Sequence, residues 1–159
     1  MKNKQVINPL KAQLWLIGLM FFFSQACAYS LRYNLVKASR TIDGDTIKLN
    51  NLGKVRYLCI NTPEIHHSQK PPEPYGEQAW IKNIQLLVSE WVVLEFDLSR
   101  RDRYGRLLAL VYSSSGLVNA QLLKNGYATL MVIPPNQSCQ ACFIPLEKNA
   151  RDQHLGIWK

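Results

Sequence analysis

The amino-acid sequence predicts an α+β fold, mainly β, in which five strands close into a small barrel accompanied by three α-helices. Three features of the 159-residue chain predict it. Short segments with alternating apolar residues are separated by turns rich in Asp, Asn and Gly. One segment of helical periodicity precedes the fourth such strand, and two more follow the fifth. No internal repeat or low-complexity tract indicates a second domain.

The first three strands form a predicted meander. We expect strands at residues 31–39, 46–49 and 54–60. Between the first two, Thr41–Asp45 contains an Asp-Gly-Asp turn, because Asp and Gly reverse a chain at little cost. Asn50–Gly53 has the composition of a hairpin connection and joins the second strand to the third.

Helices and two more strands make up the rest of the pattern. The proline-rich loop 61–74 precedes a helix that we expect to reach about Glu90, since apolar residues recur there at helical spacing. Met131–Cys142 has the composition of an irregular loop, and Gly126 is placed to end the helix before it. The other strands and helices are expected at 91–98, 106–112, 118–125 and 145 to about 153. A five-stranded barrel of this kind is of the OB type, which often binds nucleic acids or sugars.

The N-terminus has the three parts of a secretory signal. Three lysines and no acidic residue precede an apolar run over 14–23, and Ala26-Cys27-Ala28 offers a cleavage site with small residues. We therefore expect residues 1–28 to be a signal peptide and residues 29–159 to be the mature domain, in the periplasm or the medium. The apolar run is too short to cross a bilayer comfortably, so we expect no stable membrane association after cleavage. An uncleaved anchor is the alternative.

The predicted mature domain is basic. Its net charge is +5, since the signal removes three of the 19 basic residues and none of the 11 acidic ones. A basic surface suits an anionic partner such as nucleic acid, although it suits other partners too.

Three cysteines remain in the predicted mature domain. Export favours disulfides, and Cys139 and Cys142 are close in sequence, so we expect a disulfide between them. Cys59 alternates with apolar residues and is expected to be a buried thiol. A zinc site would need further ligands at suitable spacing.

Four short clusters hold the residues suited to chemistry. Hydrolysis of a phosphodiester is helped by a cation on the phosphate, by fixed positive charge on the phosphoryl oxygens, and by a group that activates or orients water. The clusters offer each of these parts. They are Asp43-Gly44-Asp45-Thr46, then Arg56, then Asn61-Thr62-Pro63-Glu64, and then Asp102-Arg103-Tyr104-Gly105-Arg106.

Each part has a candidate residue. Asp45 follows a glycine in a tight turn, which is a good position from which to direct a carboxylate at a hard cation. Arg56 and Arg106 lie on predicted strands and could each bind phosphate oxygens through a guanidinium fork. Glu64 begins a loop, from which it can reach a water molecule near the metal.

The chain resembles the staphylococcal (micrococcal) nuclease family, also called thermonucleases, over nearly the whole predicted mature domain. The order, spacing and flanking elements of the matching segments all agree, and together they are specific. The segments are IDGDT at 42–46, VRYLCINTPE at 55–64, YGEQA at 75–79, DRYGR at 102–106, VNAQLLKNGYA at 118–128 and HLGIW at 154–158.

The resemblance implies the OB barrel with three helices and a Ca²⁺-dependent endonuclease. Such an enzyme cuts DNA and RNA, leaves 3′-phosphate ends, favours single-stranded substrates and acts as a monomer. Asp45 and the Thr62 backbone carbonyl would be calcium ligands. Glu64 would be the general base or would position water, and Arg56 and Arg106 would bind the reacting phosphate.

The same resemblance gives roles to the neighbouring residues, and it shows two departures from the family pattern. Asp43 and Thr46 would line the metal pocket behind the ligands, and Arg103 and Tyr104 would lie beside the nucleotide. Asn61 stands where the best-known member has a second calcium-binding Asp. Its amide still offers an oxygen but no charge, so we expect weaker metal binding and a changed preference among divalent metals.

The second departure concerns the base pocket. Val132 and Pro134 stand where tyrosines of the family help to form it. Because stacking on a base contributes about 1–3 kcal/mol, substrate affinity or base preference is expected to differ.

A non-catalytic OB-fold module that binds nucleic acid is the alternative interpretation. OB barrels often bind nucleic acid without cutting it, and Asn61 favours this alternative. The presence of Asp45, Arg56, Glu64 and Arg106 favours the enzyme.

Overall fold

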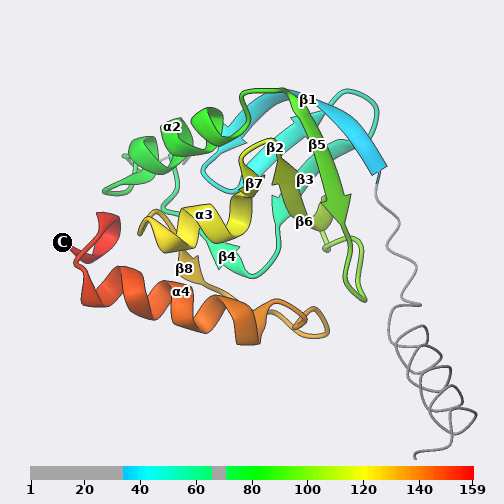
Figure 1. Ribbon diagram of the computed structural model, residues 1–159. Coiled ribbons are helices and arrows are strands. Elements are labelled where there is room, and N and C mark those ends of the chain that lie inside the picture. The colour runs from blue at the N-terminus through cyan, green and yellow to red at the C-terminus, as the bar shows by residue number, and fades with distance from the viewer. Residues whose placement is uncertain (1–33, 66–70) are drawn as a thin grey trace, which may run out of the picture. The chain divides into compact units, whose positions relative to one another are not determined.

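The computed structural model describes residues 34–65 and 71–159, and the predicted signal peptide, residues 1–28, lies outside the described residues. The described chain forms a β-barrel with three α-helices and several shorter elements (Figure 1). The barrel strands are β1 (Asn34–Asp43), β2 (Thr46–Leu49), β3 (Gly53–Tyr57), β5 (Trp91–Glu95) and β6 (Leu107–Ser113). The helices are α2 (Gly76–Leu86), α3 (Val118–Lys124) and α4 (Gln140–Asp152). Within these residues, no helix has the length and apolar character needed to cross a membrane.

A parallel pairing between β3 and β6 closes the barrel. The other neighbours, in the order β3-β2-β1-β5-β6, are antiparallel. In the closing pair, Val55 lies opposite Leu107 and Tyr57 opposite Ala109. Closure gives both outer strands a hydrogen-bonding partner. The described residues therefore confirm the predicted five-stranded OB-type barrel with three helices.

Strand β1 is shared between the two sides of the barrel. Residues 34–37 pair with β5, and residues 38–43 pair with β2. The register with β2 shifts twice, and such irregularities bend a strand. Residues 31–33 of the expected strand 31–39 lie outside the described residues, and the rest of it continues to Asp43, so that the turn is confined to Gly44 and Asp45. The shifts interrupt the alternating pattern, which explains why the sequence placed the end of this strand too early.

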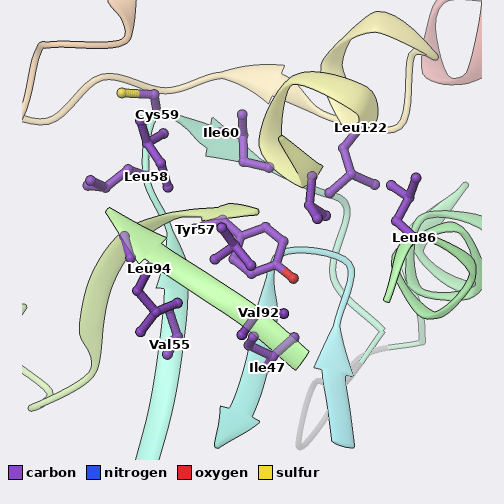
Figure 2. Close-up of a cluster of buried hydrophobic side chains, with 14 of the residues drawn as sticks. Ile47, Val55, Tyr57, Leu58, Cys59, Ile60, Leu86, Val92, Leu94 and Leu122 are labelled. Carbon is purple, nitrogen blue, oxygen red and sulfur yellow. The ribbon is translucent and has the colours of Figure 1, made fainter. Parts of the chain in front are cut away.

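The barrel interior holds the hydrophobic core (Figure 2). Strand β5 shows the alternation that predicted it, because Val92 and Leu94 are buried while Trp91 is 50% exposed. Burying such side chains contributes about 1.5–3 kcal/mol each, so apolar period-2 segments are driven inward. Buried side chains come from every barrel strand, including Ala38, Ile47, Leu49, Val55, Tyr57, Val92, Leu94 and Val111.

Two fully buried asparagines attach the helices to the barrel. On α2, Asn83 accepts a hydrogen bond from the Tyr57 hydroxyl at 2.9 Å and donates to the Asp43 carbonyl at 3.0 Å. On α3, Asn119 accepts from a backbone N–H of β6 at 2.9 Å and donates to the Leu58 carbonyl at 2.9 Å. Because buried amides need such partners, these contacts fix where each helix packs. Helix α2 thereby supports the turn that follows Asp43.

Other boundaries also differ from expectation, and strand β5 ends at Glu95 rather than at residue 98. The predicted strand 54–60 is divided into β3 and β4 (Ile60–Asn61), because Cys59 has a φ of 63° and turns the chain. Strand β4 then pairs with β8 (Thr129–Leu130). Helix α2 ends at Leu86 rather than near Glu90. Helix α4 begins at Gln140 and contains Pro145 in its interior. Proline favours the first turn of a helix, and that preference placed the predicted start too late.

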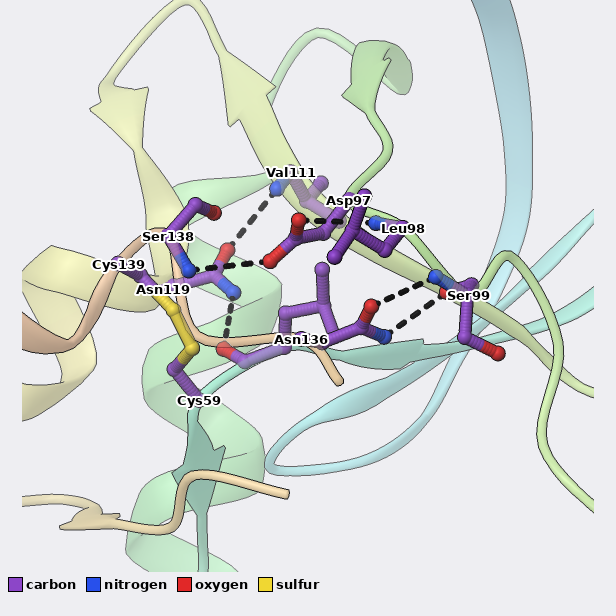
Figure 3. The surroundings of a disulfide bond; sticks show 10 residues. Cys59, Asp97, Leu98, Ser99, Val111, Asn119, Asn136, Ser138 and Cys139 are labelled. Carbon is purple, nitrogen blue, oxygen red and sulfur yellow. Dashed lines mark hydrogen bonds between the residues drawn. A yellow bond between two sulfur atoms is a disulfide. The ribbon is translucent and has the colours of Figure 1, made fainter. Parts of the chain in front are cut away.

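The disulfide predicted between Cys139 and Cys142 is wrong. Cys59 is bonded to Cys139 across 80 residues of sequence, with their Cα atoms 6.5 Å apart (Figure 3). Cys139 precedes the first turn of α4 and is 4% exposed, whereas Cys142 is exposed and free. The burial predicted for Cys59 is confirmed, but it is not a thiol. The pairing follows from which cysteine faces the barrel, and proximity in sequence does not decide it.

Candidate active site

The turn between β1 and β2 places acidic side chains at one end of the barrel. Gly44 lies so close to the loop after β4 that an added Cβ would be 2.6 Å from the Thr62 hydroxyl oxygen and 2.9 Å from the Ala79 Cβ. Only glycine permits this approach. Asp45 therefore lies against the Thr62 loop and is only 1% exposed.

Protein donors surround the Asp45 carboxylate. One oxygen accepts the Thr62 backbone N–H at 2.9 Å and forms an ion pair with the Arg56 guanidinium. The other accepts the Thr46 hydroxyl at 3.0 Å. Burial raises the pKa of Asp45, and the Arg56 charge and the Thr62 N–H act against that rise. A buried carboxylate of this kind is compatible with the fold because it is paired and hydrogen-bonded.

Arg56 connects two parts of the cluster. It lies on β3 opposite Thr46 and is 8% exposed. Its guanidinium pairs with Asp45 and also donates to the Asn61 side-chain oxygen at 2.7 Å. One planar cation therefore holds the β1–β2 turn and the end of β4 in a common arrangement, which a lysine could not reproduce.

Glu64 faces the group of side chains around Asp45, which also includes Asp43 and Arg56 and is called the acidic cluster below. Its pKa is raised to about 8, first by a hydrogen bond with the Asp43 carboxyl, then by partial burial and by the negative charges of Asp43 and Asp45. The positive charge of Arg56 opposes the shift. Hydrogen bonds with Glu73 fix the backbone of Glu64, because its N–H donates to the Glu73 carboxylate at 3.1 Å and its carbonyl accepts the Glu73 N–H at 2.9 Å.

The chemistry of this cluster suits a hard cation. Within residues 34–65 and 71–159, no three His, Cys, Asp or Glu side chains form a ready metal-binding group. The predicted ligands would instead hold a cation through the Asp45 carboxylate together with neutral oxygens, namely the Asn61 amide and the Thr62 carbonyl, and through water. Such an all-oxygen set fits Ca²⁺ or Mg²⁺ and does not fit zinc. The hydrogen bond with Asp43 and burial are the larger causes of the raised pKa of Glu64, and the negative charges of Asp43 and Asp45 add to it. A divalent cation would relieve this last contribution.

A pocket adjoins the acidic cluster and shares Arg56 with it. The parallel register places Leu108 opposite Arg56. Because residues two apart on an extended segment point to the same side, Arg106 faces the same side as Arg56. Both arginines line a cavity of about 480 Å³. The cavity can therefore bring an anionic group into contact with two guanidinium groups.

The turn after Ser99 positions Arg106 at the pocket. Asp102 accepts the Arg106 side-chain Nε–H at 2.7 Å and the backbone N–H groups of Tyr104 and Arg106 at 2.9 and 3.0 Å. Burial alone would raise the pKa of Asp102, but these hydrogen bonds outweigh it and lower the pKa. Asp102 therefore stays ionised and orients Arg106 at neutral pH.

The rim of the pocket carries an aromatic ring between cations. Tyr104 is 68% exposed, and the Arg103 and Arg106 guanidinium carbons lie 4.8 and 5.6 Å from the centre of its ring. Arg103 also donates to the Tyr104 hydroxyl at 2.6 Å. The opposite wall is formed by residues 131–136, among them Met131 and Ile133. This combination offers a flat aromatic surface and an apolar wall beside the arginines.

The structure brings the predicted site residues together in two adjoining groups. The roles assigned to these residues stay predictions. The acidic cluster contains Asp43, Asp45, Thr46, Arg56, Asn61, Thr62 and Glu64. The pocket contains Arg56, Arg103, Tyr104 and Arg106.

Sequence reasoning missed four polar residues that support these groups. They are Asn83, Ser99, Asn119 and Asn136. The three asparagine side chains hydrogen-bond to the backbone of a distant segment, and the Ser99 backbone hydrogen-bonds to the Asn136 side chain. No local pattern marks such residues, because one hydrogen-bond partner of each lies 37 to 61 positions away.

An OB-type barrel that combines an acidic cluster with two arginines at a pocket has the groups needed to bind a phosphate ester. Comparison with known proteins then gives the family. Residues 54–159 match the family model described as staphylococcal nuclease homologue. The chain belongs to the staphylococcal nuclease family.

Individual relatives agree with this assignment. The chain is 35% identical over 123 residues to the thermonuclease of Staphylococcus intermedius, covering 76% of this chain and 73% of that protein. It is 44% identical over 128 residues to endonuclease YncB and 43% identical over 128 residues to SPbeta prophage-derived endonuclease YokF, both of Bacillus subtilis (strain 168). These matches cover 77% of this chain but only 61% and 43% of the two Bacillus proteins, so the chain spans less than two thirds of their length.

Proposed function

We propose that the protein is an endonuclease that hydrolyses phosphodiester bonds of DNA and RNA with the help of a divalent cation, Ca²⁺. The observation that carries the proposal is the position of Arg56, which pairs with Asp45 and Asn61 in the acidic cluster and lines the pocket together with Arg106. A phosphate bound there would meet two guanidinium groups beside a carboxylate cluster. The names endonuclease and thermonuclease of the relatives support the same activity.

The chain's own residues supply most of the proposed mechanism. Arg56 and Arg106 bind the phosphoryl oxygens and stabilise the negative charge that develops on them during attack. Glu64, in its ionised form, accepts a proton from the attacking water or orients it. A cation held by Asp45, Asn61 and Thr62 would supply Lewis-acid polarisation and further positive charge. Because the chain belongs to this nuclease family, we also propose that cleavage leaves 3′-phosphate ends.

Substrate form and location follow as parts of this proposal. The exposed Tyr104 ring and the apolar wall suit an unstacked base, so we propose a preference for single-stranded nucleic acid. From the family relationship we also propose that the protein acts as a monomer. We further propose export by the signal at residues 1–28. The Cys59–Cys139 disulfide supports it, since disulfides persist mainly outside the cytosol.

Cleavage of denatured DNA by the purified protein tests the proposed function. We expect cutting in the presence of Ca²⁺, its loss when a chelator is added, and its return when Ca²⁺ is restored. End labelling of the products is expected to show 3′-phosphates. DNA binding without cutting in Ca²⁺, Mg²⁺ or Mn²⁺ would overturn the proposal in favour of a binding module.

The replacement Asn61→Asp is expected to strengthen cation binding. It adds a carboxylate next to Asp45, and an added negative ligand typically raises the affinity of a Ca²⁺ site. We expect the Kd for Ca²⁺, measured by calorimetry, to fall on the order of tenfold, which corresponds to about 1.4 kcal/mol. Asn51→Asp is the matched control, because it adds the same charge at an exposed hairpin. Equal Kd values for the two variants would show that Asn61 is not a ligand.

A further inference from the structure

One wall of the pocket is a loop that buries very little of itself. Within residues 131–139, Ile133 is 62% exposed and Met131 is 37% exposed. Only Asn136 and Cys139 are buried, at 3% and 4% exposure. Because hydrophobic stabilisation scales with the apolar area removed from water, packing alone does little to position this loop. Its place beside the pocket therefore depends on hydrogen bonds and on the disulfide of Cys139.

Both ends of the loop are attached to one residue, Cys59. At the start, the Met131 N–H donates to the Cys59 carbonyl at 2.9 Å. At the end, Cys139 is bonded to the Cys59 sulfur (Figure 3). Cys59 lies between Arg56 and Asn61, at the corner where β3 turns into β4, and it also lines the cavity. A single corner residue therefore closes the loop and ties it to the strand that carries Arg56.

The middle of the loop is attached to the other side of the pocket. The Asn136 side chain accepts the Ser99 N–H at 2.7 Å and donates to the Ser99 carbonyl at 2.8 Å, as Figure 3 shows. The Ser138 N–H donates to Asp97 at 3.0 Å. Ser99 begins the turn that positions Tyr104 and Arg106. The wall is thus connected to both segments that supply arginines to the pocket.

We propose that the Cys59–Cys139 disulfide is a positioning element of the substrate pocket. It holds the wall formed by residues 131–136 against Arg56 and Arg106, and it thereby sets the affinity for the nucleotide rather than the rate of bond cleavage. The inference rests on the proposed nuclease function. A substrate whose reacting phosphate contacts Arg56 and Arg106 would place other parts of the nucleotide against the wall. Contacts that are equal in the ground state and the transition state change KM without changing kcat.

A variant without the disulfide tests this inference. We would replace Cys139→Ala in a Cys142→Ser background, which prevents any other pairing, and compare it with Cys142→Ser alone. We expect KM for a single-stranded oligonucleotide, and its Kd in the presence of chelator, to rise about tenfold, as for the loss of roughly one base contact. We expect kcat to change by no more than about twofold. Amide hydrogen exchange over residues 131–138 is expected to become faster.

A noncovalent variant gives an independent measurement. Asn136→Ala removes the clamp on Ser99 but keeps the disulfide, and we expect KM and Kd to rise in the same direction. If circular dichroism shows that Cys139→Ala is unfolded, two other samples are compared with the untreated wild-type protein. They are Asn136→Ala and the wild-type protein treated with a thiol reductant below its unfolding temperature. Unchanged KM and Kd, or a lower kcat at constant KM, would overturn the inference.

Failure of the proposed function would be recognisable separately. If Cys142→Ser itself cuts no nucleic acid, the nuclease proposal fails. The oligonucleotide Kd and the amide exchange of the wall still measure the effect of the disulfide in that case. Equal Kd and equal exchange with and without the disulfide would then reject the positioning role as well.

Discussion

Replacing Glu64 with glutamine is expected to lower kcat for DNA cleavage by about 10²- to 10⁴-fold, the usual contribution of a general base. Glutamine keeps the shape of the side chain and can still hydrogen-bond to Asp43, but it cannot accept a proton from water. The fold is expected to persist, because the change removes one of three crowded carboxyl groups around Arg56. The measurement is single-turnover cleavage of denatured DNA in Ca²⁺.

A neighbouring acidic residue provides the control for this prediction. Glu77 lies in the first turn of α2 and is exposed, so Glu77→Gln removes the same charge outside the acidic cluster. We expect its kcat to match that of the wild type. Cleavage by Glu64→Gln at a rate near that of Glu77→Gln would rule out the role assigned to Glu64. Retained oligonucleotide binding by Glu64→Gln would show that the loss concerns the chemical step.

Replacing Arg56 with alanine is expected to reduce both activity and stability. Asp45 is 1% exposed, and it would remain buried without its cationic partner. Removing one member of a buried ion pair typically costs about 3–5 kcal/mol, so we expect the free energy of unfolding at neutral pH to fall by that amount. Urea denaturation measures it. Added Ca²⁺ is expected to restore part of the stability, because it supplies the missing positive charge.

Replacing Arg106 with alanine distinguishes the loss of activity from the loss of stability. Its pair with Asp102 is partly exposed, and pairs of this kind contribute about 1 kcal/mol or less. We therefore expect Arg106→Ala to lose cleavage as Arg56→Ala does, while its free energy of unfolding stays near that of the wild type. Equal losses of stability in the two variants would contradict the assignment of Arg56 as the counter-charge of the buried acid.

Local patterns of apolar residues were sufficient to predict most of the fold. The alternation at 46–49 and the helical spacing at 118–125 correspond closely to β2 and α3. In both places, burial of one face forces the local conformation that the pattern indicates. Boundaries were less predictable where a special backbone conformation intervenes, as at Cys59, or where a proline lies inside a helix, as at Pro145.

The candidate site was predictable in its residues but not in its connections. The motifs around Asp45, Arg56 and Glu64 are local, so resemblance to a family could identify them. The ion pair of Arg56 with Asp45 and the contact of Glu64 with Asp43 depend on how the β1–β2 turn meets the end of β4. The close approach at Gly44 decides that geometry, and it is visible only in three dimensions.

Local sequence patterns were enough to predict the class of fold, the set of chemical groups and their order along the chain, because apolar periodicity and short motifs act over a few residues. The parallel closure of β3 on β6, the partner of Cys139, and the attachment of the 131–139 wall to Cys59 and Ser99 became apparent only in the folded chain. Each of these joins segments separated by tens of residues. Their pairing depends on which side chains the closed barrel turns toward one another, and no local pattern encodes that.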